Sequence, residues 1–256
     1  MKLQKIKDFG KSFGLALLGE TDPKRNIPHV NIRRIDTIVS DLVKIKDAQW
    51  SEYAFSREPV KEKFSTSDRK ELAERAAFCG RKNAKNYIDR FGTSQPSIIA
   101  EKMSIQVTQL PEPKSGNRVL FAEYCDPDEI HIFSDGVTRG EALLERPGIL
   151  KTFGGGFSIY GVLLGHELFH AIESRDEQRI WTKTYETELW KLGKWAYKSH
   201  VACLSEIAAM SFTQYINQLS WSPYVMDAFL VYGYSPMAAS ALYEEMMIST
   251  GLKPRL

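Results

Sequence analysis

Residues 165–174 read GHELFHAIES, and within them His166, Glu167 and His170 form the pattern HExxH. In an α-helix, residues four apart lie on one face, roughly 6 Å from each other, so both imidazoles can reach one cation. Zinc accepts imidazole nitrogen at about 2.0–2.1 Å. Glu167 follows the first histidine and reaches a water on that cation from the edge of the same face. One turn of helix therefore predicts two zinc ligands, His166 and His170, and a catalytic general base, Glu167.

The residues that flank the motif are apolar nearly all round the helix. They are Val162, Leu163, Leu164, Leu168, Phe169 and Ile172. A helix of this kind lies at the centre of a protein, where ionisable side chains are costly unless something satisfies them. The flanks therefore favour a metal site over two histidines that meet by accident on a surface helix.

A catalytic zinc site usually has three protein ligands and a water, and two carboxylates compete for the third place. Glu173 lies three residues after His170 on the same face, but it borders the charged turn SRDEQR. Glu206 lies on a later helix, in SEIAAMSF, as a lone acid among apolar residues that needs a partner. The small Ala209, one turn on, would let the two helices approach closely. We therefore expect Glu206 to be the third ligand and Glu173 to lie beside the site or at the surface.

The composition is that of an ordinary globular protein, with 256 residues of which 43% are hydrophobic and 26% charged. A net charge of +2 gives no field that would gather nucleic acid or acidic lipid, so we expect neither as a partner. Cys79, Cys125 and Cys203 are far apart and form no CxxC pair, which indicates neither a disulfide framework nor a cysteine zinc site. No run approaches the ~18 apolar residues of a membrane span. These features predict a cytoplasmic protein.

Apolar residues at helical spacing predict a helix over residues 31–47, and a polar loop over residues 56–68 follows it. A helix-start signal at Asp68 opens a second helix that ends near Gly92, and Pro96 opens a short third one. The first part of the chain is therefore expected to be helical.

The period changes at Ile105, where apolar residues begin to alternate. The same alternation occurs in RVLFAEY (residues 118–124) and in IHIF (residues 130–133), and it predicts a small sheet of three or four strands. The motif helix is expected just after this sheet, over residues 157–173. Further helices are expected over residues 181–198, 200–218, 223–232 and 236–249. The pattern as a whole predicts a mainly helical α+β fold.

GHELFH followed by SEIAAMSF resembles the gluzincin branch of the HExxH zinc metallopeptidases, in which HExxH and a Glu-x-x-Ala on a later helix bind zinc. Short bacterial ImmA/IrrE-type peptidases are similar in size, in the stretch AEKMSI and in a strand pair before the motif helix. Neprilysin-type peptidases are similar in the order AEYCDPDEIHIF, GIL, YGVLLGHELFHAIE and Glu206-x-x-Ala209, although they are typically large, extracellular and disulfide-rich. The resemblance covers roughly residues 96–218. It implies a zincin-like metallopeptidase domain over residues 96–256, with residues 1–95 as a helical region packed on it in one compact unit.

The resemblance also implies the activity, which is hydrolysis of peptide bonds in a peptide or protein substrate with one Zn²⁺ per chain. Zinc lowers the pKa of a water toward 7, and Glu167 takes its proton and later delivers it to the leaving amine. An extended substrate would add to the edge of the sheet, either at residues 122–124 or at IHIF. Sheet core is an equally good interpretation of those strands.

Two features depart from the gluzincin pattern. Many gluzincins carry an aspartate four residues after the third ligand that orients a histidine, and here that position is Met210. Its role would fall to another group, for which Glu173 is a candidate. Tyr232, Tyr234 and His200 are candidates for stabilising the transition state, but packing roles are better expectations for all three.

Two other classes of protein share part of this pattern. A non-catalytic zincin fold that uses its metal as a sensor or interaction module fits the missing aspartate and the lack of a clear transition-state group. A carboxylate-bridged di-iron protein also uses Glu-x-x-His, which Glu167 and His170 form, but it needs a second such pair on another helix. No other histidine of the chain is preceded by glutamate at that spacing, so the di-iron class fits poorly.

Overall fold

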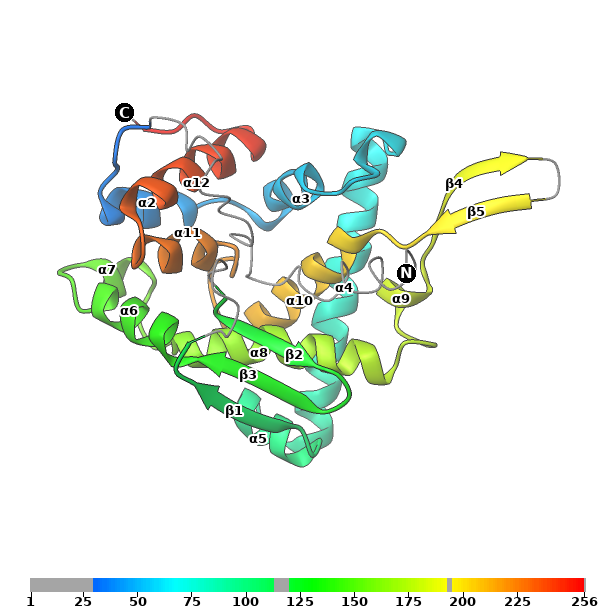
Figure 1. The fold of residues 1–256 in the computed structure, drawn as a ribbon, viewed down its shortest axis with the longest axis horizontal. Helices are drawn as coiled ribbons and strands as arrows, with labels where there is room; N and C mark the ends of the chain where they lie inside the picture. The colour runs from blue at the N-terminus through cyan, green and yellow to red at the C-terminus, as the bar shows by residue number, and fades with distance from the viewer. Residues whose placement is uncertain (1–29, 113–119, 193–194, 256) are drawn as a thin grey trace.

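The computed structural model describes residues 30–112, 120–192 and 195–255, and these form a mainly helical α+β fold with two small sheets (Figure 1). Residues 1–29 of the expected N-terminal region lie outside the described part of the chain. The helices are α2 (Ile35–Leu42), α3 (Asp47–Ser56), the 3-10 turn η1 (Lys61–Lys63), α4 (Thr66–Phe91), α5 (Pro96–Lys102), α6 (Ser134–Leu144), α7 (Ile149–Thr152), α8 (Ile159–Arg175), α9 (Trp181–Thr184), α10 (Ala202–Ile216), α11 (Val225–Tyr232) and α12 (Pro236–Ser249). Among the described helices, none combines the length and apolar character needed to span a bilayer.

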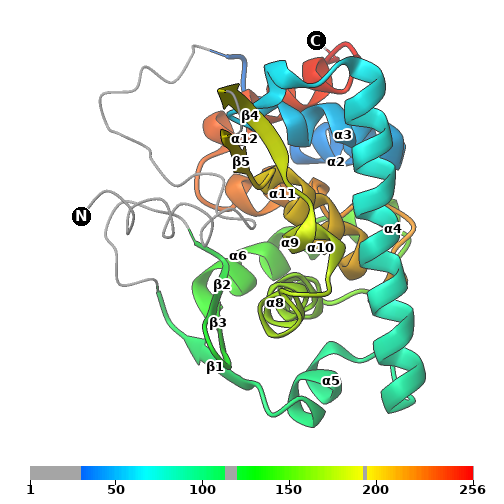
Figure 2. The same ribbon diagram turned by 90° about the vertical axis from the view of Figure 1, so that its right-hand side faces the viewer.

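The larger sheet has the strand order β1-β3-β2, with bounds Gln106–Leu110, Ala122–Cys125 and Glu129–Phe133 for β1, β2 and β3. Strand β3 pairs parallel with β1 and antiparallel with β2. Ala122, Ile130 and Ile132 are buried on one face of the sheet. Helix α8 packs against the sheet, and Figure 2 shows it beside β2 and β3. Because β3 is the central strand, IHIF does not present an edge, and that expectation is wrong. Strand β2 does lie at an edge.

Helix α8 carries the HExxH motif, and its neighbours are the sheet on one side and α10 on another (Figure 2). The helix begins after Ser158, whose hydroxyl accepts a hydrogen bond from the Gly161 amide. Its apolar residues are buried on every side, as the sequence predicts for a central helix. The buried residues of α2 to α4 and those of the sheet, α8 and α10 belong to one continuous core.

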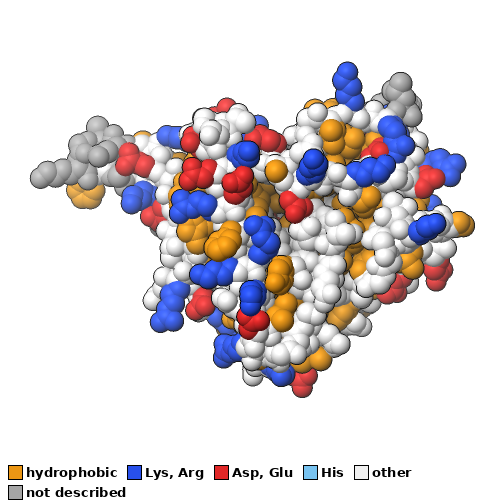
Figure 3. All heavy atoms as spheres, turned by 180° about the vertical axis from the view of Figure 1, so that it is seen from behind, with side chains coloured by type: hydrophobic (Ala, Val, Ile, Leu, Met, Phe, Trp, Pro, Cys, Tyr) orange, Lys and Arg blue, Asp and Glu red, His pale blue; other side chains and the backbone are white. Residues whose placement is uncertain are grey.

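Helix α4 is the longest described helix and runs along α10. It starts with a capping box in which Ser65 and Asp68 bond each other's backbone amides, two residues before the predicted start. It ends at Gly92, which adopts a left-handed conformation with φ of 69°. On the face of the molecule in Figure 3, Lys and Arg side chains are interspersed with Asp and Glu, in keeping with the small net charge.

Two helix predictions from the sequence are wrong. The helix expected over residues 31–47 ends at Leu42, because the chain turns there and buries Ile45 from outside the helix. A second helix, α3, then begins, which the sequence analysis does not predict; it buries Trp50, Tyr53 and Phe55.

The segment 181–198 forms only the short α9 and then a hairpin of β4 (Thr187–Leu192) and β5 (Trp195–Ser199). Threonine and aromatic residues favour strands, and Gly193 interrupts the helical pattern. Trp190 and Tyr197 are directly paired across the hairpin, and their rings stack with centroids 6.1 Å apart. This cross-strand pair stabilises the hairpin in place of the expected helix.

Helices α4 and α10 touch through backbone at Gly80. A methyl group added there would lie 2.1 Å from the carbonyl oxygen of Ala208, which cannot move without bending α10. We expect Gly80→Ala to lower the free energy of unfolding by about 1–3 kcal/mol, the usual cost of overpacking, even though alanine favours helix. Gly140→Ala is the matched control, because the added methyl meets only the flexible ends of Ile159 and Leu230. Denaturant unfolding measures both, and an equal effect of the two variants contradicts the backbone contact.

Candidate metal centre

The candidate metal centre lies where α8 faces α10. Helix α8 places His166 and His170 on one face, one turn apart, and α10 brings Glu206 towards them. The side chain of His166 is fully buried and that of Glu206 is 9% exposed, whereas that of His170 is 17% exposed. The site is therefore enclosed on most sides and reaches the surface beside His170.

The three side chains point their donor atoms at a common point. The Nε2 atoms of His166 and His170 are 3.1 Å apart. Glu206 Oε2 lies 3.4 Å from His166 Nε2, and its Oε1 lies 3.6 Å from His170 Nε2. Two donors at zinc–nitrogen distance from one tetrahedral cation are about 3.3 Å apart. The structure thus brings together the three residues predicted as ligands, with one donor atom of each within 4.8 Å of the others.

Glu173 is buried beside His170, so the expectation of a surface position is wrong and that of a place beside the site is right. Its Oε2 accepts a hydrogen bond of 2.6 Å from the Ser205 hydroxyl, lies 3.1 Å from Lys183 Nζ and lies 3.6 Å from His170 Nδ1. Burial opposes ionisation, but His170, Lys183 and Ser205 together lower the pKa of Glu173 to about 2. Glu173 is therefore an anion that faces the ring nitrogen of His170 away from the other donors.

Glu167 is buried beside Tyr124 of β2. Burial raises the pKa of its carboxyl, while the charges of His166 and His170 and the backbone amide of Tyr124 oppose that rise. The Phe133 amide donates a hydrogen bond to the Phe121 carbonyl oxygen, so the alternation of an antiparallel pair directs the backbone groups of Tyr124 away from β3. Glu167 therefore lies between the two histidines and the outer edge of the sheet.

Asp227 is a buried acid that the sequence analysis does not single out. It lies on α11, and its Oδ2 accepts a hydrogen bond of 3.2 Å from the Tyr53 hydroxyl. Burial raises the pKa of Asp227 to about 7, although the charges of Arg57 and His166 lower it. Within the described structure, its Oδ1 and the Nδ1 of His166 are both buried without a hydrogen-bond partner. Asp227 is a lone acid in the apolar stretch VMDAFLVY, the same signal that identifies Glu206.

The other candidates lie apart from the three donors. Tyr234 packs on Phe121 and under the Arg139 guanidinium, and Tyr232 lies under Arg146. His200 lies 3.2 Å from the Tyr185 carbonyl oxygen. These contacts fit the packing roles expected for Tyr232 and Tyr234. The side chain of His200 is 57% exposed, so the packing role expected for His200 is wrong.

Met210, where many gluzincins carry an aspartate, is buried in the core.

Comparison with known proteins finds no relatives: no protein-family model, no curated protein and no solved structure matches this chain. The geometry of the site is therefore the evidence on function.

The raised pKa of Asp227 predicts how stability depends on pH in the metal-free protein. The folded state holds the Asp227 proton more tightly than the unfolded chain, so the free energy of unfolding falls as pH rises from about 4 to about 7. Asp227→Asn should remove this part of the decline and make the variant more stable than the parent at pH 8, by an amount on the order of 4 kcal/mol at most. Urea unfolding of chelator-treated protein at several pH values measures it.

Tyr53→Phe is the control, since it removes the hydroxyl that contacts Asp227 but keeps the acid. It should keep the pH dependence. Identical pH profiles for the parent and Asp227→Asn would contradict a raised pKa.

Proposed function

We propose that the chain is a zinc-dependent metallopeptidase of the gluzincin type, which hydrolyses peptide bonds in a peptide or protein substrate. The observation that carries the proposal is the convergence of His166, His170 and Glu206, with donor atoms 3.1–3.6 Å apart. Glu167, next to the first of these residues, supplies the carboxylate that a hydrolytic site needs.

The donor set fits Zn²⁺, with one ion per chain. Two imidazole nitrogens and one carboxylate oxygen are the three protein ligands of a common type of catalytic zinc site, which leaves a further position for water or substrate. The partial exposure of His170 gives that position a path to the surface. Glu173, 3.6 Å from His170 Nδ1, is placed to fix the orientation and protonation of that ring.

His166, His170 and Glu206 would hold the zinc ion, which when bound would supply a Lewis acid and lower the pKa of water toward neutrality. Glu167 takes a proton from the attacking water and delivers it to the leaving amine. Burial raises the pKa of the Glu167 carboxyl, which makes its carboxylate a better proton acceptor.

An extended substrate would be positioned along β2. Ala122 and Tyr124 direct their backbone groups away from β3, towards the side on which Glu167 lies. A peptide that adds there as a further strand would bring its carbonyl groups past the metal centre, with affinity from main-chain hydrogen bonds. A zincin-like domain over residues 96–256 accounts for this order of sheet, motif helix and third-ligand helix.

Metal content tests the site. Protein purified without added metal or chelator should contain about one zinc per chain more than Glu206→Ala does, by elemental analysis, and that difference is the ion held at this site. Glu206→Ala should weaken zinc binding by more than about 100-fold, because it removes a ligand and leaves two histidines. Glu101→Ala, which removes an exposed acid from α5, is the control and should bind zinc like the parent. Absence of zinc binding by the parent at neutral pH refutes the site.

Glu167→Gln tests the chemistry separately from the metal. The amide keeps the shape of the side chain but cannot accept the proton, so zinc content should be unchanged and peptide hydrolysis should fall by about 10²–10⁴-fold. Cleavage of an unfolded protein or of a peptide library by the zinc-loaded parent is the assay. A variant that retains full activity excludes Glu167 as the base. A zinc-loaded parent without any cleavage would instead support the alternative, a non-catalytic zincin-fold sensor.

A further inference from the structure

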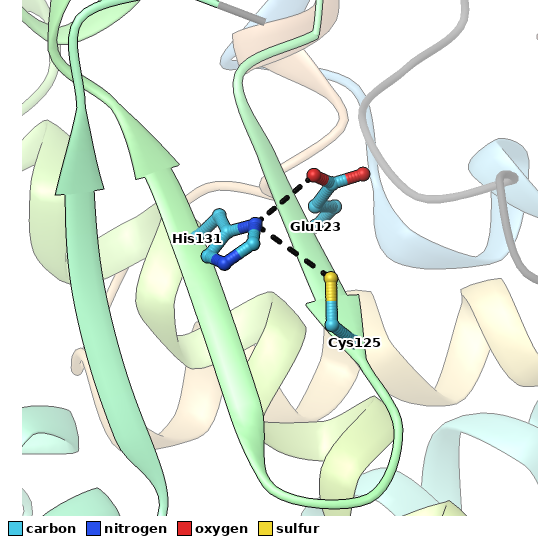
Figure 4. Close-up of side chains that lie close together, drawn as sticks. All are labelled: Glu123, Cys125 and His131. Atoms are coloured by element: carbon cyan, nitrogen blue, oxygen red, sulfur yellow. Dashed lines mark hydrogen bonds and ion pairs between the residues drawn. The ribbon is translucent and has the colours of Figure 1, made fainter. Parts of the chain in front are cut away.

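The opposite face of the sheet from α8 carries a second group of metal-binding side chains. In the antiparallel register, Glu123 lies opposite His131, and Cys125 lies opposite Glu129. All four side chains therefore share one face, the face turned away from the buried Ala122 and its neighbours. Figure 4 shows the ring of His131 on β3 turned towards Glu123 and Cys125 on β2.

Two of the three donor separations match a tetrahedral cation, and the third is within 4.8 Å. His131 Nδ1 lies 3.1 Å from Glu123 Oε1 and 3.6 Å from Cys125 Sγ. From zinc–ligand lengths, a nitrogen and an oxygen on one tetrahedral ion are about 3.3 Å apart, and a nitrogen and a sulfur about 3.5 Å apart. The longer separation falls on the sulfur, as the longer zinc–sulfur bond requires.

A further carboxylate holds the ring of His131 from its other side. His131 Nε2 lies 2.9 Å from Glu129 Oε1, and that oxygen also accepts a hydrogen bond of 3.4 Å from the Thr108 hydroxyl on β1. A proton on Nε2, donated to Glu129, leaves the lone pair of Nδ1 directed at the other two donors. Metal-binding histidines are commonly oriented by such a carboxylate.

We propose that Glu123, Cys125 and His131 form a second cation site, for a divalent transition metal of the zinc type. A thiolate and an imidazole select zinc-like ions over magnesium or calcium, which prefer oxygen ligands. The ion would join β2 to β3 across the hairpin, and its binding would displace the thiol proton of Cys125. The sequence alone does not predict this site, because Glu123, Cys125 and His131 meet only when β2 and β3 pair in this register.

Cobalt titration of the full-length protein tests the proposal, because a thiolate bound to Co²⁺ gives a near-ultraviolet charge-transfer band. The site of His166, His170 and Glu206 has no cysteine and cannot give that band. The parent should develop the band with one equivalent of Co²⁺ at the second site, whether or not the first site binds metal. The cobalt band therefore tests the second cation site independently of the proposed peptidase activity.

Cys125→Ser should abolish the band, and His131→Gln should weaken cobalt binding at this site by more than about 10-fold. Glu129→Gln should weaken it by about 10–100-fold, because it removes the group that orients the ring. Cys79→Ser is the matched control, since it removes another thiol outside the cluster, and it should keep the band; circular dichroism checks that each variant is folded. A parent without the band, a band that survives Cys125→Ser, or one that His131→Gln leaves unchanged overturns the proposal.

Discussion

The burial of α8 is the constraint on which the arrangement of the site depends. Helix α8 is buried around most of its circumference and withdraws the polar atoms of His166 and Glu167 from water. Neighbouring elements supply partners for most of these atoms, His166 Nδ1 excepted. Helix α10 supplies Glu206, and the edge of the sheet supplies the Tyr124 amide. The same need explains why Glu173 has three polar neighbours of its own. The polar groups around α8 form a connected set, and in such a set the loss of one member leaves others unpaired.

Much of this arrangement can be predicted from the sequence, because lone polar residues in apolar helices need partners. That reasoning selects Glu206 over Glu173, and Glu206 does lie beside His166. The same reasoning applies to Asp227, a lone acid in the apolar helix α11. Where apolar and polar residues do not follow one clear period, as in the β4–β5 hairpin, the interpretation fails, because strand propensity and cross-strand pairing decide the structure there.

Pairs across a sheet are harder to predict than pairs along a helix. Within α8 the spacing of His166 and His170 fixes which side chains meet, since helix geometry does not vary. Across β2 and β3, a shift of one residue would turn Glu123 and Cys125 to the opposite face from His131. The length and shape of the intervening turn set that register. The second cation site therefore follows from the structure and not from any motif in the sequence.

The close approach of Gly80 to the Ala208 carbonyl bears on how the chain can be divided. Helix α4 precedes the sheet and the motif in the sequence, yet it covers one flank of α10, the helix that carries Glu206. A fragment that starts at the sheet would keep HExxH intact but would expose that flank to water. The helices before residue 96 and the part of the chain that carries the motif therefore cannot be exchanged separately without rebuilding the surface between α4 and α10.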